Sequence, residues 1–374
     1  MKKADIGIVG GGLAGLTAAI HLASRGLKVL LFEKEKYPHH KVCGEYLSRE
    51  ILPYLESFNI SLDSLNPKNI DQLIYSTPSG KEIEAKLKLG GIGISRYALD
   101  NYLYEKAKEQ NVEIIQQTVA TISFEEEVFK IITLDNKIVA ANVVLGAFGK
   151  RSSLDKKLNR SFIGKKSGWL AVKAHYKLDN YPQNRVALHN FEGGYCGLSK
   201  TETGAVNVCY LASYESFKDH KSINSFKDEV LCKNPQLKSF FDQATPLFET
   251  DLSIAQVSFE KKSLVKDHIL MLGDAAGLIH PLCGNGMAMA FHSAKIASES
   301  ILKFYNPNSL SRSDIEKEYI KKWNHKFKSR MKMGSLLQKI LLSPALAEAS
   351  HNIIKTFPSL LPFIITKTHG KPVI

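Results

Sequence analysis

The feature that most constrains this chain is a glycine-rich turn near its amino terminus, between a short apolar segment and a longer helical one. Residues 5–9 are expected to form a buried strand, residues 13–24 a helix and residues 28–32 a second strand. A strand, a glycine turn, a helix and a strand within about 30 residues form a βαβ unit. Such a unit requires a parallel sheet with a right-handed crossover. The sequence therefore predicts an α/β fold of the Rossmann type.

The glycines of this turn fit the pattern G-x-G-x-x-G. Gly10 permits the tight turn, Gly12 lets the backbone approach a pyrophosphate, and Gly15 lets the helix pack closely on the strand. Glu33 lies 21 residues after Gly12, where an acidic side chain accepts hydrogen bonds from ribose hydroxyls. An ordinary glycine turn is the alternative, but the strand, helix and acid in register favour a dinucleotide site. The predicted cofactor contacts in this unit are Gly10, Gly12, Leu13, Ala14, Gly15, Glu33 and Lys34.

A second pattern, far along the chain, favours FAD over NAD as the cofactor. A strand expected at residues 268–272 delivers Asp274 to a sharp turn, where its carboxylate is expected to bind a ribityl hydroxyl. Residues 284–286 then open a helix whose first N–H groups are expected to stabilise negative charge on the flavin. A connection with small residues for packing is the alternative. The predicted contacts here are Gly273, Asp274, Pro281, Gly284, Asn285, Gly286 and Met287.

Two more segments lie between these patterns: residues 41–45 (KVCGE) and residues 95–100, with Ser95, Arg96, Leu99 and Asp100. Together the four segments resemble the geranylgeranyl reductase branch of the flavin monooxygenase superfamily, from residue 4 to about residue 302. The resemblance implies FAD as the cofactor and a split, glutathione reductase-like FAD-binding domain. It implies that Arg96 contacts the ribityl or phosphate region, that Cys43 and Gly44 lie near the isoalloxazine ring, and that residues 193–199 form a strand covering it. Further predicted contacts are Val119 and Gly149.

Three departures limit what the resemblance implies. Phe148 stands where the superfamily usually has the Asp of an Asp-Gly pair, so the mode of NADPH engagement does not carry over. Residues 195–199 (YCGLS) replace the aromatic strand of the reductases, so a prenyl substrate does not simply carry over either. The paired tryptophans of flavin halogenases are absent, because the only tryptophans are Trp169 and Trp323. Halogenation is not expected.

The sequence has no second dinucleotide fingerprint. Gly91 and Gly93 are followed by Arg96 where the third glycine belongs. We therefore expect NADPH or NADH to act as a transient electron donor, or a separate reductase to supply the electrons.

The expected organisation is an FAD-binding domain interrupted by a second sheet. Residues 1–75, 95–158 and 263–302 are assigned to the FAD-binding domain, and residues 76–94 and 159–262 to an inserted antiparallel-sheet substrate domain. A hairpin with its turn at Asp135 and Asn136 is expected in the first domain, and a helix at residues 96–110. Residues 303–374 are expected to form a helical cap.

Cys43 is the one candidate catalytic residue, as a thiol near the flavin or substrate that donates a proton. The alternative is a small apolar residue packed under a loop, as most free cysteines are. Glu45 is interpreted as a solvated loop acid, and His280 and Cys283 as lining residues of the flavin-facing turn. No cluster has metal-ligand spacing, so no metal site is predicted.

Charge and cysteine content suggest the surroundings of the chain. Its five cysteines are widely spaced, without a CxxC pair, which favours a reducing, cytoplasmic location. Of the net charge of +13, +9 lies in residues 301–374, which hold 13 Lys and Arg against 4 Asp and Glu. This basic segment, with its apolar stripes, either packs on the core or makes peripheral membrane contact. No nucleic-acid-binding motif is present, and no apolar run is long enough to span a membrane.

These observations predict an FAD-dependent oxidoreductase acting on a hydrophobic small molecule. The first hypothesis is a reductase that transfers hydride to a double bond of a prenyl- or polyketide-like substrate. The second is a monooxygenase that hydroxylates or epoxidises a lipophilic or aromatic substrate. A third is a flavoprotein that keeps FAD as a structural element and acts through a partner.

Overall fold

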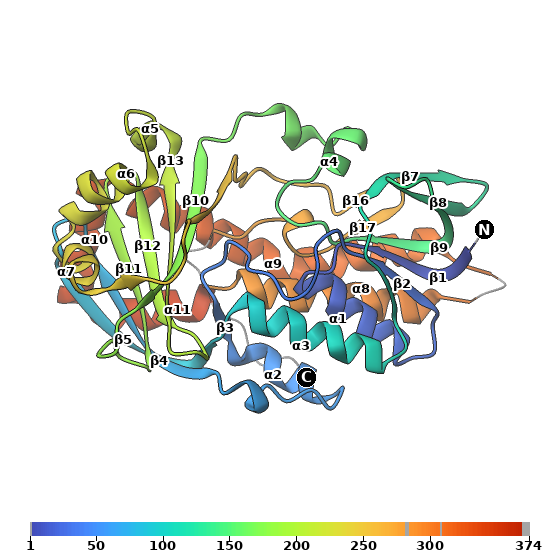
Figure 1. Ribbon diagram of the computed structural model, residues 1–374, viewed down its shortest axis with the longest axis horizontal. Helices are drawn as coiled ribbons and strands as arrows, with labels where there is room; N and C mark the ends of the chain where they lie inside the picture. The colour runs from blue at the N-terminus through green and yellow to red at the C-terminus, as the bar shows by residue number, and fades with distance from the viewer. Residues whose placement is uncertain (1, 281–283, 307–308, 369–374) are drawn as a thin grey trace.

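The computed structural model describes residues 2–280, 284–306 and 309–368. Two β-sheets lie at opposite ends of an elongated molecule, and helices run between them (Figure 1). Most of the first sheet lies in the amino-terminal third of the chain and most of the second in the middle third. The predicted mixed α/β architecture is confirmed.

The first sheet is the predicted Rossmann-type sheet. Strand β1 pairs in parallel with β2 on one side and β9 on the other, and β2 and β9 pair in parallel with β6 and β17. Strands β7 and β8 extend from β9 as an antiparallel ribbon, which confirms the hairpin at Asp135 and Asn136. The strands, in sheet order, are β16 (Val265–Lys266), β17 (Ile269–Met271), β9 (Ile138–Gly146), β1 (Lys2–Val9), β2 (Val29–Phe32) and β6 (Glu113–Ile115), with β7 (Val119–Glu125) and β8 (Val128–Thr133) off this path.

The first sheet with the helices that pack on it is called the first unit, and the second sheet with its helices the second unit. Helix α1 (Leu13–Ala23) lies at the centre of the first unit and packs against α3 (Arg96–Glu109) and α8 (Gly286–Phe304). Its sequence is mostly apolar, and all residues from Leu13 to Leu22 are buried, Thr17 and His21 included. A helix that is apolar all round is stable only when it is enclosed by other elements. The three helices were predicted from the sequence, and their bounds are confirmed within one or two residues.

The second sheet has nine strands, and it is antiparallel except where β11 pairs with β4. Side chains of β10 alternate between its two faces. Leu170, Val172 and Ala174 pack with α6 and α7 in one apolar cluster, whereas Ala171 belongs to a different cluster on the other face. The strands, in sheet order, are β14 (Thr245–Pro246), β10 (Trp169–Lys177), β13 (Val206–Ser213), β12 (Gly194–Lys200), β11 (Arg185–Phe191), β4 (Lys68–Ser76), β5 (Glu82–Gly93) and β3 (Tyr46–Ser48), with β15 (Leu252–Ala255) beside β10.

The second sheet begins earlier in the chain than the predicted division at residue 75. Strand β3 and most of strand β4 lie before that residue, yet both strands pair within the second sheet. Gln72 of β4 pairs with Arg185 of β11, more than a hundred residues away. Pairing over such a separation leaves no local pattern, which explains the difference.

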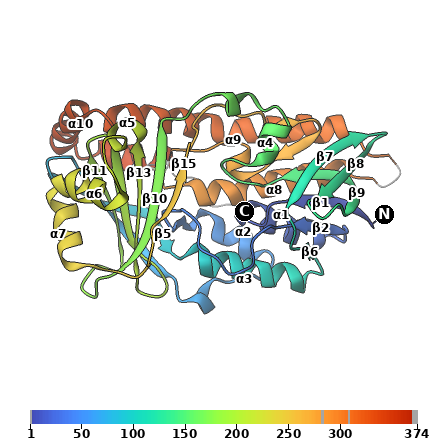
Figure 2. The same ribbon diagram turned by 45° about the horizontal axis from the view of Figure 1, so that its top comes forward.

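The region after residue 310 is mostly helical, as predicted, and its described residues form three helices. Helix α9 (Arg312–Leu341) runs along the molecule from the first sheet to the second (Figure 2). Arg312 donates hydrogen bonds to backbone carbonyls at Asn142 and Glu127, and the carbonyl of Leu341 accepts one from Asn190 in β11. The remaining helices are α2 (Leu52–Glu56), α4 (Ser153–Lys157), α5 (Tyr214–Phe217), α6 (Ile223–Glu229), α7 (Pro235–Gln243), α10 (Pro344–Thr356), α11 (Leu360–Thr368) and the 3₁₀ segments η1 (Arg49–Ile51), η2 (Asp63–Leu65), η3 (Ser161–Gly164), η4 (Leu231–Lys233) and η5 (Gly273–Ala275).

Helix α9 belongs to the core of the first unit, and this can be tested. Phe327 is fully buried beside Trp323 and His292, whereas Ile320 on the same helix is 38% exposed. We expect Phe327→Ala to lower the free energy of unfolding by about 3–5 kcal/mol, because it removes buried contacts and leaves a cavity. Ile320→Ala is the control, with an expected change of about 0.5 kcal/mol or less in denaturant unfolding. Equal changes in the free energy of unfolding for the two substitutions would show that α9 lies on the surface of the first unit and not in its core.

Candidate functional site

The glycine turn joins β1 to α1 at very close range. Gly10 has a φ of +107°, and a Cβ there would lie 2.3 Å from the carbonyl oxygen of Ala147. A Cβ on Gly15 would lie 1.9 Å from the carbonyl oxygen of Gly10. Both positions therefore require glycine, and the predicted reason for Gly15, close packing of helix on strand, is confirmed.

Gly12 is different, because its surroundings are open and basic. A Cβ on Gly12 would meet only Arg96 Nη2 at 3.5 Å and Lys41 Nζ at 3.9 Å. Gly12 is the N-cap of α1, and no side chain caps this helix. Both cations also bind Asp100, at 2.6 and 2.8 Å. Two cations held by Asp100 and the positive end of a helix lie beside Gly12, an arrangement that suits a pyrophosphate.

The charge of Asp100 is maintained by these two cations. Burial raises the pKa of Asp100, but the charges of Arg96 and Lys41 outweigh burial and lower it below its ordinary value. Asp100 therefore stays ionised and orients both cations at the turn. Lys41 had no predicted role, although it lies in the KVCGE segment.

Glu33 stabilises the same turn from the end of β2. Its Oε2 accepts a hydrogen bond from the Gly11 N–H at 2.8 Å, and its Oε1 accepts one from the Glu35 N–H at 3.0 Å. The ribose contact of Glu33 stays a prediction. Lys34 lies apart from the site, with an exposed side chain that pairs with Glu35. Val119 is the first residue of β7. It lies four residues after Ile115, whose carbonyl oxygen accepts a hydrogen bond from the Glu33 N–H.

The second predicted pattern lies against the first. A Cβ on Gly273 would lie 3.2 Å from the Cβ of Ala14 in α1. Lys262 Nζ donates to the carbonyl oxygens of Asp274 and Lys150, at 2.7 and 2.8 Å, so it joins this turn to the turn after Gly149. Burial lowers the pKa of Lys262 to about 8.

The start of α8 completes this side of the site. Gly284 lies next to the ring of Tyr46, Asn285 and Met287 are buried, and Gly286 opens the helix. Pro281 and Cys283 lie outside the described residues. The structure thus brings the turns after β1, β9 and β17 together with the start of α8.

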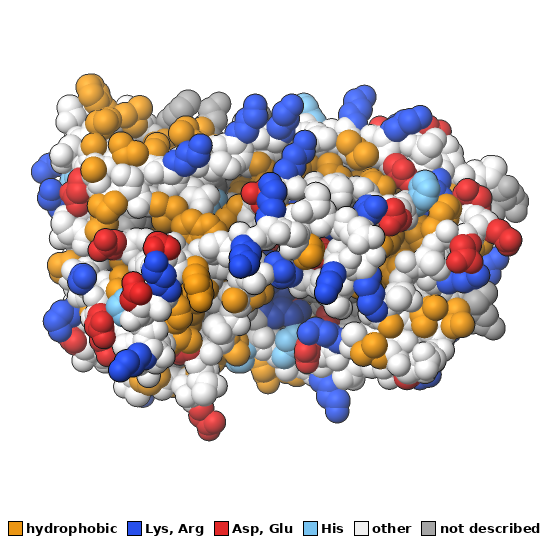
Figure 3. Space-filling model, turned by 90° about the horizontal axis from the view of Figure 1, so that it is seen from above, with side chains coloured by type: hydrophobic (Ala, Val, Ile, Leu, Met, Phe, Trp, Pro, Cys, Tyr) orange, Lys and Arg blue, Asp and Glu red, His pale blue; other side chains and the backbone are white. Residues whose placement is uncertain are grey.

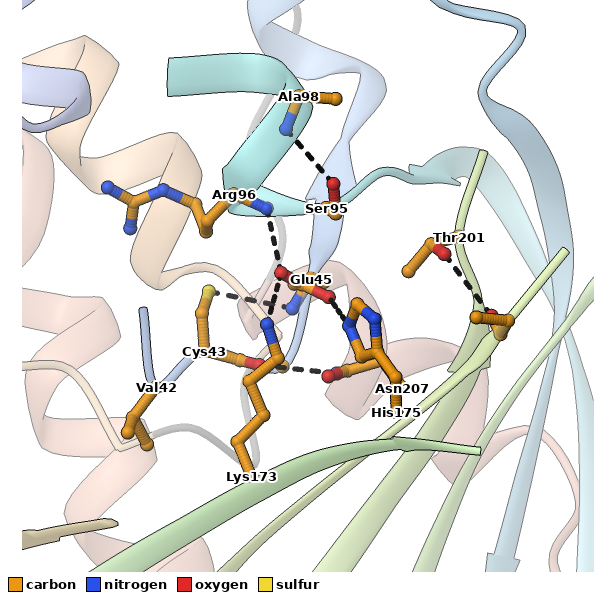
Figure 4. A network of polar contacts seen from close by, with 12 residues as sticks. Val42, Cys43, Glu45, Ser95, Arg96, Ala98, Lys173, His175, Thr201 and Asn207 are labelled. Carbon is orange, nitrogen blue, oxygen red and sulfur yellow. Dashed lines mark hydrogen bonds and ion pairs between the residues drawn. The ribbon is translucent and has the colours of Figure 1, made fainter. Parts of the chain in front are cut away.

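The Cys43–Gly44 segment docks on the second sheet (Figure 4). The carbonyl of Cys43 accepts a hydrogen bond from Asn207 Nδ2 at 3.2 Å, and that of Gly44 accepts one from Ser199 Oγ at 3.5 Å. The Cys43 thiol is half-buried and accepts the Glu45 N–H at 3.5 Å. The proton-donor role of Cys43 stays a prediction.

The sequence suggested that Glu45 is a solvated loop acid, and this interpretation is wrong. Glu45 is fully buried, with Lys173 Nζ 2.5 Å from Oε1 and His175 Nε2 2.7 Å from Oε2. Burial raises the pKa of Glu45, but the hydrogen bond from His175 and the charge of Lys173 outweigh it, so the pKa is lowered. The only sequence signal for this cluster is polar Lys173 and His175 alternating with apolar residues along β10.

His40, Glu45 and His175 offer three ligand atoms within 4.8 Å of one another, in the described part of the chain. These groups are metal ligands in other proteins. However, the ammonium group of Lys173 already lies against Glu45, and a metal ion there would be repelled. Burial, together with Lys173 and His175, lowers the pKa of His40 to about 4. Because of Lys173, we assign Glu45 to a charge pair, and the absence of a metal site stays a prediction.

An apolar surface of largely buried side chains adjoins the Cys43–Gly44 segment on the same face of the second sheet. Val42 packs in one cluster with Tyr195 of β12 and Leu211 of β13. His280 lies against the rings of Tyr195 and Phe259, with centroids 5.7 and 4.8 Å away. Burial lowers the pKa of His280 to about 3, so this residue is neutral. Figure 3 shows the centre of one face of the molecule hollowed, with Lys and Arg side chains around the hollow.

The position of the pyrophosphate can be tested at Gly12. Gly12→Ala is expected to weaken FAD binding about tenfold or more, because its methyl group enters the space between the turn and the two cations. The melting temperature is expected to change little, since no atom lies closer than 3.5 Å. Gly15→Ala is the comparison, and its clash with Gly10 is expected to cost about 1–3 kcal/mol of stability. Wild-type FAD affinity of Gly12→Ala would place the pyrophosphate elsewhere.

Curated relatives extend over nearly the whole chain. Digeranylgeranylglycerophospholipid reductase of Methanococcus aeolicus is 26% identical, covering 96% of this chain and 96% of the relative. Conditioned medium factor receptor 1 of Dictyostelium discoideum is 22% identical, covering 94% of this chain and 73% of the relative. The resemblance to geranylgeranyl reductases is confirmed by the first of these.

Solved structures share the fold at low identity. A geranylgeranyl bacteriochlorophyll reductase-like protein of Thermoplasma acidophilum superposes with a TM-score of 0.75 at 21% identity, covering 91% of this chain and 88% of that one. The flavin-dependent brominase Bmp2 superposes with a TM-score of 0.79 at 18% identity, covering 98% and 93%.

The family model described as FAD binding domain matches residues 3–309. This match spans the glycine turn, both basic residues beside it and the turn at Asp274. Because it covers most of the sequence, the chain belongs to the FAD binding domain family.

Proposed function

We propose that this FAD-dependent oxidoreductase reduces a double bond of a hydrophobic, prenyl- or polyketide-like substrate, with hydride derived from NADPH or NADH. The observation that carries the proposal is the apolar surface beside the Cys43–Gly44 segment, on the inner face of the second sheet. The archaeal relative named as a reductase of a geranylgeranyl lipid supports this substrate class.

The residues of the site have separate tasks in this proposal. Lys41 and Arg96, with the amino end of α1, would hold the pyrophosphate of FAD. The bound flavin supplies hydride transfer. The apolar side chains around Tyr195, with Val42 at their edge, would bind the substrate beside the cofactor and exclude water from it.

The electron donor is expected to bind transiently. Gly91 and Gly93 lie within strand β5 of the second sheet and do not open a helix, so they do not form a second dinucleotide site. A separate reductase that supplies electrons is the alternative.

A monooxygenase is the second candidate, because Trp169, Tyr195 and Phe259 give the apolar surface an aromatic character. Such a surface suits an aromatic substrate. Halogenation is not proposed. The two tryptophans lie apart, Trp169 in the second sheet and Trp323 in the core of the first unit.

Product analysis separates the two reactions. With NADPH, geranylgeranyl diphosphate or a geranylgeranylated glycerophospholipid is expected to gain two hydrogen atoms per reduced double bond, at the same rate with and without oxygen. Mass spectrometry and an oxygen electrode provide the measurement. A product that gains one oxygen atom, with matching oxygen uptake, would identify a monooxygenase. A purified protein that binds no FAD would overturn both proposals.

We also propose that the carboxyl-terminal helices contact an anionic lipid surface. Leu346 and Ile353 lie seven residues apart on α10, and Phe357 follows at the end of this helix; all three are at least half exposed. The +9 charge of residues 301–374 would complement anionic headgroups. No helix in the described residues has both the length and the hydropathy of a membrane-spanning segment. The proposed contact is therefore peripheral.

Vesicle flotation tests this contact. We expect the protein to float with phosphatidylserine-containing vesicles and much less with phosphatidylcholine vesicles. Changing Leu346, Ile353 and Phe357 to Ser is expected to reduce the floating fraction about fivefold or more, because less apolar surface is buried in the lipid. Leu134→Ser is the control, since Leu134 is 66% exposed but lies near the β8–β9 turn. Equal flotation of all variants would contradict the proposal.

A further inference from the structure

Strand β10 presents two polar side chains, Lys173 and His175, to the first unit. Leu170, Val172 and Ala174 face α6 and α7, whereas Lys173 and His175 point the other way and meet Glu45 (Figure 4). Lys173 and Glu45 are fully buried, and His175 is nearly so. Charges in such surroundings are stable only when paired. Glu45 therefore joins the second sheet to the first unit electrostatically, on the side where the cofactor is proposed to bind.

Glu45 also holds the start of α3. Its Oε1 accepts the Arg96 N–H at 2.7 Å, and its own carbonyl accepts the Ile94 N–H at 3.1 Å. Arg96 is the first residue of α3, and its guanidinium group lies beside Gly12. A displacement of the Glu45 carboxylate would thus displace a residue of the pyrophosphate site.

The backbone at Glu45 is unusual as well. Its φ is +53°, a left-handed conformation that few residues other than glycine adopt without compensating contacts. The preceding Cys43 and Gly44 carbonyls are held by Asn207 and Ser199 of the second sheet. The conformation of the Cys43–Gly44 segment therefore depends on contacts made by both units.

We propose that Glu45 is a positioning residue that couples cofactor binding to the second sheet. Its carboxylate ties Lys173 and His175 to Arg96 and to the Cys43–Gly44 segment, so FAD binds in its working geometry only while these contacts hold. The inference rests on the proposed function only through the FAD site, and not on which reaction follows.

A buried ion pair can also contribute to stability alone. The variants must therefore separate the positioning of Arg96 from the charge of the Glu45 carboxylate. Glu45→Ala alone would leave Lys173 buried without its partner. We therefore use two charge-matched double variants, Glu45→Ala with Lys173→Met and Glu45→Gln with Lys173→Met. The Gln side chain keeps an acceptor for the Arg96 N–H, whereas Ala does not. Ser95 remains bound by Glu202, at 2.6 Å, which keeps the start of α3 anchored in both variants.

The chain offers a matched control in a second buried cluster, which has Arg in place of Lys but is otherwise of the same composition. Glu50 pairs with Arg330 at 3.3 Å and lies 3.7 Å from His292. This cluster joins η1 to α8 and α9 and makes no contact with residues 43–45 that the structure describes. The control is Glu50→Ala with Arg330→Met.

The measurements are the dissociation constant of FAD from the apoprotein, the visible circular dichroism of the bound flavin, and the melting temperature. The double variant Glu45→Ala with Lys173→Met is expected to bind FAD about tenfold or more weakly and to change the visible spectrum. The double variant with Gln in place of Glu45 is expected to stay within about threefold of the wild type. The control is expected to lower the melting temperature while leaving FAD affinity unchanged.

Two results would overturn the inference. One is wild-type FAD affinity and spectrum in Glu45→Ala with Lys173→Met. The other is a loss of FAD affinity that follows melting temperature across all variants, including the control. A wild-type protein without FAD would instead overturn the proposed function, so the two failures are distinguishable.

Discussion

The close approach of helix α1 to strands β1 and β9 is the constraint on which the rest of the structure depends. It requires the absence of side chains at Gly10 and Gly15, because a Cβ at either position would clash with backbone. With α1 so placed, Gly12 opens the helix toward Arg96, and Ala14 meets Gly273. The proposed pyrophosphate site and the position of the second turn are therefore consequences of one packing contact.

A second set of interactions joins the two sheets. Helix α9 binds the first sheet at its start and β11 at its end, which fixes the distance between the units. Glu45 joins them again, at the site itself, by charge. Such a buried pair contributes little net stability compared with apolar replacements, but breaking one partner is costly. The ion pair of Glu45 is thus better explained by the positions that it gives its partners than by the stability that it adds.

The fold leaves the reaction open, because one architecture carries a reductase-like protein and a brominase at comparable TM-scores. The second sheet carries apolar and aromatic side chains at one end of β10, and Lys173 and His175 at the other. The substrate proposed above would bind at the apolar end, since Lys173 and His175 are occupied by Glu45.

The sequence by itself determined the βαβ unit, the glycine turns and the helices at residues 96–110 and 286–304. These depend on local spacing, capping and the periodicity of apolar residues, all of which lie within short segments. Only the tertiary structure decided that β3 and β4 belong to the second sheet, that Lys41 joins Arg96 at Gly12, and that Glu45 is buried. Each of these depends on partners far away in the chain: β4 pairs with β11, and Glu45 lies 128 residues from Lys173. A contact of that kind is fixed by packing, and no local pattern records it.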